Sequence, residues 1–135
     1  MLFKINTLED WQMVVDAIIP KLQHRILLLK GNLGAGKTTF SQFLLKSLGS
    51  TDEVSSPTYT IVNEYDTPNG VVFHFDLYRM KSVEEVYDIG MEDYLDNARL
   101  CIIEWPDIYE DDLEENTFHT ISIDNNEGVR EIKFS

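Results

Sequence analysis

A glycine-rich stretch, GNLGAGKTT from Gly31 to Thr39, holds the residues of this sequence best suited to bind an anion. Glycine has no side chain, so successive backbone N–H groups can turn toward phosphate oxygens without obstruction. Lys37 adds a positive charge, and the Thr38 hydroxyl is an oxygen ligand of the kind that Mg²⁺ prefers. The spacing G-x-x-x-x-G-K-[ST] places the lysine within reach of β- and γ-phosphates. We therefore expect this loop to bind phosphate.

The segments on either side of the loop provide the context that such a loop requires. RILLLK, residues 25–30, is a continuous apolar run typical of a strand buried on both faces. Apolar residues follow the loop at helical spacing: Phe40, Phe43, Leu44 and Leu48. A helix starting there would point its positive N-terminal end at the bound anion. The alternative is a plain turn between strand and helix, and pattern and context together favour a P-loop.

Two carboxylates end strongly apolar segments and are candidates for the catalytic acids of such a site. Asp76 ends VVFHFD and Glu104 ends LCIIE. A P-loop site needs an acid at the end of a neighbouring strand to hold Mg²⁺ or to orient the attacking water. Either residue taken alone is equally compatible with a solvated strand-end acid. His74 shares the strand face of Asp76, and a histidine satisfied within the core is its simpler interpretation.

Thr58 and Thr60, in SSPTYT, carry hydroxyl groups that could sense a γ-phosphate. The equally good alternative is that both residues belong to an ordinary loop that enters a strand. DIYEDDLEEN, residues 107–116, carries six acids and no base. A solvated loop is the favoured interpretation of this acidic run, and a docking surface for a basic partner is the alternative.

The remaining pattern predicts a mixed α/β chain. Thr7 and Asp10 have N-cap spacing before a helix that ends at Pro20, and residues 82–90 form a second short helix. Strands are expected at the following ranges: 59–65 paired with 70–76, 100–105, and 118–124 paired with 129–135. This order predicts a P-loop NTPase-like mixed sheet with helices on its faces and antiparallel hairpin additions.

Bulk properties limit the classes of function. A chain of 135 residues with 43% apolar residues fits one domain, residues 1–135. Its 24 acidic and 11 basic residues give a net charge of −13, which argues against direct binding of nucleic acid. No apolar run approaches a membrane span of roughly 20 residues, and the N-terminal segment is too polar for a signal peptide. The single cysteine, Cys101, favours the cytoplasm.

Absent motifs narrow the choice among P-loop proteins. The strings D-x-x-G and N-K-x-D of guanine-specific GTPases do not occur in the sequence. A small-molecule kinase, the third possibility, usually needs a lid and several arginines, whereas this short chain has only four arginines: Arg25, Arg79, Arg99 and Arg130. An adenine-nucleotide hydrolase or switch is therefore the better interpretation.

Five motifs in order, GNLGAGKTT, SSPTYTIVNEY, HFDLYR, IGMEDYL and IEWP, resemble the TsaE family, the bacterial ATPase subunit of tRNA threonylcarbamoyladenosine synthesis. The resemblance covers nearly the whole chain. It implies a slow Mg²⁺-dependent ATPase that works with two ASKHA-like proteins, the threonylcarbamoyl transferase and its paralogue. Together these proteins would modify the adenosine next to the anticodon in tRNAs that read ANN codons.

The same resemblance assigns roles to individual residues. The loop Leu33–Thr39, with Leu33, Gly34, Ala35, Gly36, Lys37, Thr38 and Thr39, would cradle the phosphates of ATP. Thr38 and Glu104 would ligate Mg²⁺, and Asp76 would be the acid of the HFDLYR motif. Thr58 would lie in a switch-like segment and Trp105 near the nucleotide. The residues expected near adenine and ribose are Thr7 and the stretch from Gly128 to Arg130.

An arginine at the transferred phosphate accelerates phosphoryl transfer by about 10³–10⁵-fold. Only Arg79 stands near a candidate acid in the sequence. We therefore expect feeble turnover in isolation and stimulation by the partner proteins. The competing hypothesis is a docking module that ATP occupancy controls, with incidental hydrolysis.

Overall fold

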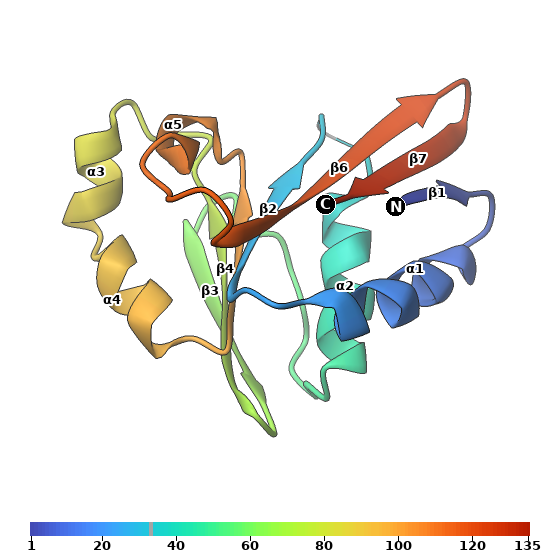
Figure 1. Cartoon of the computed structure of the whole chain (residues 1–135), viewed down its shortest axis with the longest axis horizontal. Coiled ribbons are helices and arrows are strands. Elements are labelled where there is room, and N and C mark those ends of the chain that lie inside the picture. Colours follow the sequence, from blue (N-terminus) through green and yellow to red (C-terminus); the bar gives the residue numbers. More distant parts are fainter. Residues whose placement is uncertain (33) are drawn as a thin grey trace.

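One mixed sheet organises the computed structural model, which describes residues 1–32 and 34–135 (Figure 1). Its strands are Leu2–Ile5 (β1), Ile26–Lys30 (β2), Val62–Thr67 (β3), Gly70–Asp76 (β4), Leu100–Glu104 (β5), Phe118–Asn126 (β6) and Val129–Phe134 (β7). The helices are Asp10–Ile18 (α1), the 3₁₀ turn Ile19–Lys21 (η1), Lys37–Ser47 (α2), Val83–Asp88 (α3), Met91–Asn97 (α4) and Asp107–Glu110 (α5).

The strand order is β1-β7-β6-β2-β5-β4-β3 among the described residues. β2 lies at the centre and pairs in parallel with β5 and β6, and β5 pairs in parallel with β4. The pairs β3–β4, β6–β7 and β1–β7 are antiparallel. The predicted fold class, a P-loop NTPase-like mixed sheet with antiparallel hairpin additions, is therefore confirmed. Because parallel strands end together, the segments after β2, β4 and β5 reach the same edge of the sheet.

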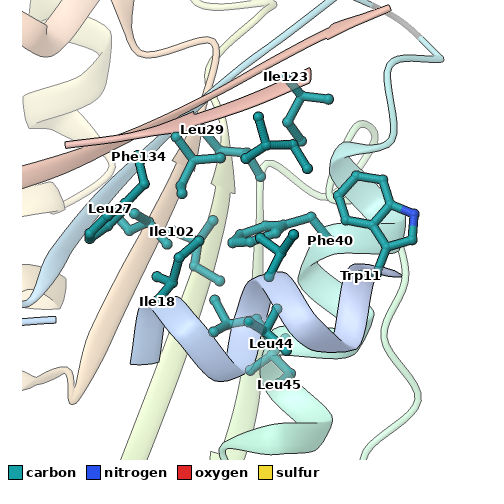
Figure 2. Packing of buried hydrophobic residues seen from close by; sticks show 14 of the residues in the cluster. Trp11, Ile18, Leu27, Leu29, Phe40, Leu44, Leu45, Ile102, Ile123 and Phe134 are labelled. Atoms are coloured by element: carbon teal, nitrogen blue, oxygen red, sulfur yellow. The ribbon is translucent and has the colours of Figure 1, made fainter. Parts of the chain in front are cut away.

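Helices cover both faces of the sheet, and the strand alternation explains why RILLLK is apolar throughout. Leu27 and Leu29 belong to a cluster with residues of α1 and α2, whereas Leu28 belongs to a second cluster with residues of α3, α4 and α5. Figure 2 shows the first cluster, in which Phe40 and Leu44 of α2 lie against the sheet. Each fully buried leucine stabilises the fold by about 1.5–3 kcal/mol. No helix within the described part of the chain is long and apolar enough to cross a membrane.

Three short elements escaped the sequence prediction. β1 is an edge strand with mostly accessible residues, so its apolar pattern is weak. α4 begins directly after Gly90, which the pattern marked only as the end of α3. α5 occupies the start of the acidic run, where Tyr109 is buried and Glu110 pairs with Lys30 at 2.6 Å. The prediction of a solvated loop over residues 107–116 is therefore wrong at its start.

Local details correct two further boundaries. The first helix begins at Asp10 after Glu9, and no side chain caps it, so Thr7 is not the N-cap. Instead the Asp10 carboxylate accepts the backbone N–H groups of Asn6 and Thr7, at 2.8 and 3.0 Å. β3 starts at Val62 rather than at residue 59. Cys101 is buried in the core.

Candidate functional site

The glycine loop leaves the C-terminal end of β2 and leads into α2. Gly36 is the N-cap residue of α2 and has φ +116°, a conformation that side chains with a Cβ rarely adopt. A Cβ on Gly36 would lie 2.8 Å from the Trp11 ring and 3.3 Å from Arg130 Nε. Arg130 Nε donates to the carbonyl of Ala35 at 2.8 Å. Glycine is therefore required here by the α1 tryptophan and the β7 arginine that pack onto the loop.

Lys37 is the first residue of α2, and its ammonium lies near the Glu104 carboxylate and the Trp105 ring. Its side chain is 7% exposed, and Nζ lies 3.6 Å from Glu104 Oε1 and 4.1 Å from the centroid of the Trp105 ring. Burial lowers the pKa of Lys37, while Glu104 and Asp76 oppose that shift. Nζ has no hydrogen-bond partner among the described residues. A buried ammonium of this kind is suited to receive an anion.

Asp76 and Glu104 are neighbours at the ends of parallel strands. They are register partners of β4 and β5, so both side chains lie on the same sheet face, the face that α2 covers. They are 6% and 3% exposed, which rules out the interpretation as solvated strand-end acids. Asp76 Oδ1 accepts the Tyr78 N–H at 2.9 Å, and Glu104 Oε2 lies 2.5 Å from Nε2 of His74.

The loop before β3 brings hydroxyl groups to Asp76. Thr58 Oγ1 donates to Asp76 Oδ2 at 3.3 Å, and it lies 2.6 Å from Ser56 Oγ. Thr60 instead donates to Asn63, at 2.6 Å. Of the two threonines considered from the sequence, Thr58 is thus the one beside the acid. Ser56 was not predicted, although it stands only two residues before Thr58.

A cavity of about 250 Å³ joins these groups. It is lined by Gly34, Gly36, Lys37, Thr38, Thr39, Ser56, Thr58, Asp76, Glu104, Trp105 and Arg130. Ten of these eleven residues were predicted from the sequence, and Ser56 is the exception. Residues far apart in the chain thus converge at the edge where β2, β4 and β5 end.

The other predicted residues are not among those that line the cavity, and one of them lies outside the residues that the structure describes. Ala35 is a buried residue of the loop, and its carbonyl accepts the hydrogen bond from Arg130 Nε. Thr7 precedes α1, and Gly128 lies in the β6–β7 turn with φ +84°. The predicted role of Leu33 lies outside the described residues. Arg79 does not line the cavity; it donates to the Tyr59 carbonyl at 2.9 Å.

Trp105 follows Glu104 with φ +52°, an uncommon conformation for a bulky residue. This turn ends β5, and the indole ring lies 4.1 Å from the Lys37 ammonium and 4.9 Å from the Tyr78 ring, measured at the ring centroids. A costly backbone conformation that is held by its surroundings is typical of functional sites.

The arrangement fits a nucleotide phosphate with Mg²⁺. The Thr38 hydroxyl and two carboxylates are hard oxygen donors, and Mg²⁺ is usually held by one or two carboxylates together with substrate phosphates. Within residues 1–32 and 34–135, no group of three or more His, Cys, Asp or Glu side chains is arranged to hold a metal alone. The buried Lys37 ammonium supplies the partner that an anion requires.

Strand, glycine loop, helix and sheet order together define a P-loop NTPase-like protein. The family model described as "Threonylcarbamoyl adenosine biosynthesis protein TsaE" matches residues 5–132. This chain therefore belongs to the TsaE family.

Individual relatives agree with this assignment. The tRNA threonylcarbamoyladenosine biosynthesis protein TsaE of Haemophilus influenzae is 39% identical over 78% of this chain and 66% of its own length. The protein of the same name from Bacillus subtilis is 36% identical over 82% of this chain and 68% of its own length. The chain thus spans about two thirds of the length of these curated relatives. The crystal structure of YdiB from Bacillus subtilis superposes with a TM-score of 0.75 and 26% identity, covering 99% of this chain and 83% of that one.

Proposed function

We propose that this chain is a Mg²⁺-dependent ATPase of the machinery that adds threonylcarbamoyl to the adenosine next to the anticodon of ANN-decoding tRNAs. ATP binding and hydrolysis would drive or reset the transferase complex. The observation that supports the ATPase best is the buried Lys37 ammonium, which has no hydrogen-bond partner in the described chain and lies 3.6 Å from Glu104. Membership of the TsaE family supports the assignment to tRNA modification.

In this proposal the phosphates of ATP bind to the loop and to the N-terminus of α2. Backbone N–H groups around Gly34 and Gly36 and the ammonium of Lys37 hold the phosphate oxygens. Thr38 and Glu104 would hold Mg²⁺, which when bound offsets the negative charge of the phosphates. These contacts exploit local donors, because the net charge of −13 repels a free nucleotide at longer range.

Asp76 is the residue best placed to orient the attacking water. Its carboxylate is fixed by the Tyr78 N–H and the Thr58 hydroxyl, and it lines the same cavity as Lys37. A water held by Asp76 would be oriented for attack on the terminal phosphate. Thr58 would then report through its loop whether that phosphate is present.

The arginines support slow turnover by the isolated chain. Arg79 is held by the Tyr59 carbonyl, and Arg130 is held by Ala35 on the loop side of the cavity. Neither arginine forms an ion pair with Asp76 or Glu104 within the described chain, and an arginine finger would act at the transferred phosphate. We propose that the threonylcarbamoyl transferase subunit and its ASKHA-like paralogue bind this chain and stimulate hydrolysis. The negative charge favours contact with these proteins over direct contact with tRNA.

The test measures ATP turnover of the wild-type chain with and without the two partner proteins. We expect slow hydrolysis alone and clear stimulation by the partners. Equal rates in both conditions would contradict the partner-dependent proposal. A second comparison uses the isolated chain and the variant Glu104→Gln. Its matched control is Glu84→Gln, which removes an exposed carboxylate of α3.

The alternative function is a docking module in which ATP occupancy controls assembly and hydrolysis is incidental. Asp76→Asn and Glu104→Gln separate the two when turnover, complex assembly and tRNA modification are all measured. Assembly that survives while modification falls in step with turnover supports the driving ATPase. Modification that persists without turnover supports the docking module.

A further inference from the structure

We infer that His74 is a positioning residue that fixes the carboxylate of Glu104 toward the cavity. This inference rests on the proposed function, because it concerns the orientation of a proposed Mg²⁺ ligand. His74 belongs to β4 and is fully buried, and its Nε2 lies 2.5 Å from Glu104 Oε2. The sequence alone favoured a satisfied core histidine, and one of its two ring nitrogens is indeed bonded.

The hydrogen-bond chemistry fixes the direction of this contact. An ionised carboxylate only accepts hydrogen bonds, so the hydrogen lies on His74 Nε2 and is donated to Glu104. Nδ1 of His74 is buried and has no partner within the described residues. An imidazole with its single hydrogen on Nε2 leaves only a lone pair at Nδ1, and unpaired acceptors are better tolerated in protein interiors than unpaired N–H donors.

Because of this contact, the two carboxylate oxygens of Glu104 have different neighbours. Oε2 is held by His74, whereas Oε1 lies 3.6 Å from Lys37 Nζ on the side of the cavity. A glutamate side chain without that anchor could rotate and withdraw Oε1 from the site. Removing the hydrogen-bonded partner of a ligating carboxylate typically lowers metal affinity or activity by about 10- to 100-fold.

A purely structural role makes a different prediction. The face of β4 that carries His74 also carries Val72, which belongs to the apolar cluster under α1 and α2. A leucine at position 74 would suit this neighbourhood, so a structural histidine would be replaced with little effect on the site. A positioning histidine cannot be replaced by leucine, because leucine donates no hydrogen bond to Glu104.

The experiment compares His74→Leu, His74→Asn and His74→Gln in the full chain. The amide nitrogen of glutamine can reach the position of the imidazole Nε2, whereas that of asparagine corresponds to Nδ1. We measure the Mg²⁺ concentration for half-maximal ATP binding and hydrolysis, and also ATP binding without Mg²⁺. The leucine and asparagine variants should raise the Mg²⁺ requirement about tenfold or more, whereas glutamine should stay within about threefold of wild type. Binding without Mg²⁺ should not change.

Two further variants distinguish a role of His74 in positioning Glu104 from a role in the stability of the fold. His119→Leu removes another buried histidine, which accepts the backbone N–H groups of Gln23 and His24 at 2.9 and 3.1 Å. It should lower the urea midpoint without changing the Mg²⁺ requirement. In a Glu104→Gln background, His74→Leu should add little further loss, because the carboxylate that His74 positions is already absent.

Several results would overturn the inference. These are a wild-type Mg²⁺ requirement in His74→Leu, equal losses in the glutamine and asparagine variants, or a full additional loss in the Glu104→Gln background. Imidazole ¹⁵N spectra of the wild type provide a test without substitution, and a hydrogen on Nδ1 instead of Nε2 would also refute it. A wild-type chain that binds no Mg²⁺–ATP overturns the proposed function itself, whereas wild-type binding with an indifferent His74 overturns only this inference.

Discussion

Replacing Gly36 by alanine tests whether the loop geometry is held by its neighbours. Gly36 has φ +116°, and a Cβ there would lie 2.8 Å from one atom of the Trp11 ring and 3.0 Å from another. Trp11 is 3% exposed and packs against Phe40, so its ring has little room to move. The substitution therefore combines backbone strain with overpacking of the core.

The magnitude follows from these two effects, and Gly34 provides a matched control. A left-handed conformation costs a residue with a Cβ about 1–2 kcal/mol, and overpacking adds about 1–3 kcal/mol. Gly36→Ala should thus lower the free energy of unfolding by about 2–5 kcal/mol. Gly34 has φ +78°, and apart from its neighbours in the chain no described residue lies within 4 Å of the position of a Cβ, so Gly34→Ala should cost only about 1–2 kcal/mol.

Urea denaturation of both variants measures the difference. A Trp11→Leu background removes the ring that meets the new Cβ, so in that background Gly36→Ala should cost about as much as Gly34→Ala. If Gly36→Ala is no more destabilising than Gly34→Ala in the otherwise wild-type chain, the packing of Trp11 on the loop is not as described.

Three other predictions address the site and its surroundings. Burial, aided by the nearby His24, lowers the pKa of His119 below its ordinary value of 6.5, so this residue contributes stability above that pH that is lost as the pH falls. Urea midpoints at pH 7.5 and 5.5 should therefore differ less in His119→Gln, whose amide oxygen accepts at both values, and an equal difference would contradict this. Glu104→Gln should raise the Mg²⁺ concentration needed for ATP binding about tenfold, whereas Glu84→Gln should not, as calorimetry at several Mg²⁺ concentrations can measure. In Trp11→Phe, the one tryptophan left is Trp105, and its emission should change when Mg²⁺–ATP enters the cavity that it lines; constant emission with calorimetrically detected binding would place the nucleotide elsewhere.

The sequence predicted the parts of the fold that depend on long apolar patterns and on glycine spacing. RILLLK, the loop from Gly31 and the helix after it form a local unit, so their order alone indicates the phosphate site. Asp76 and Glu104 were identifiable because each ends a buried strand. Their adjacency depends on the parallel pairing of β4 with β5, which no local pattern encodes.

Contacts between distant segments account for what sequence reasoning left open. In the sequence Ser56 has no feature that distinguishes it from other loop residues. In the fold it contacts the Thr58 hydroxyl, which is bonded to Asp76. His74 was weighed as a core residue because its partner, Glu104, is thirty positions away in the chain. The short helix α4 buries only Met91 completely, so its periodicity is too brief to stand out from its surroundings.

The central claim is that the loop around Gly36 and the ammonium of Lys37 capture the triphosphate of ATP. Isothermal calorimetry with Mg²⁺–ATP tests it most directly on the wild type and on Lys37→Met, which keeps an unbranched side chain of similar length without the charge. We expect saturable binding to the wild type and no detectable binding to the variant, whose folding is verified by its urea transition. Absence of binding to the wild type, or equal binding to both proteins, would contradict the account.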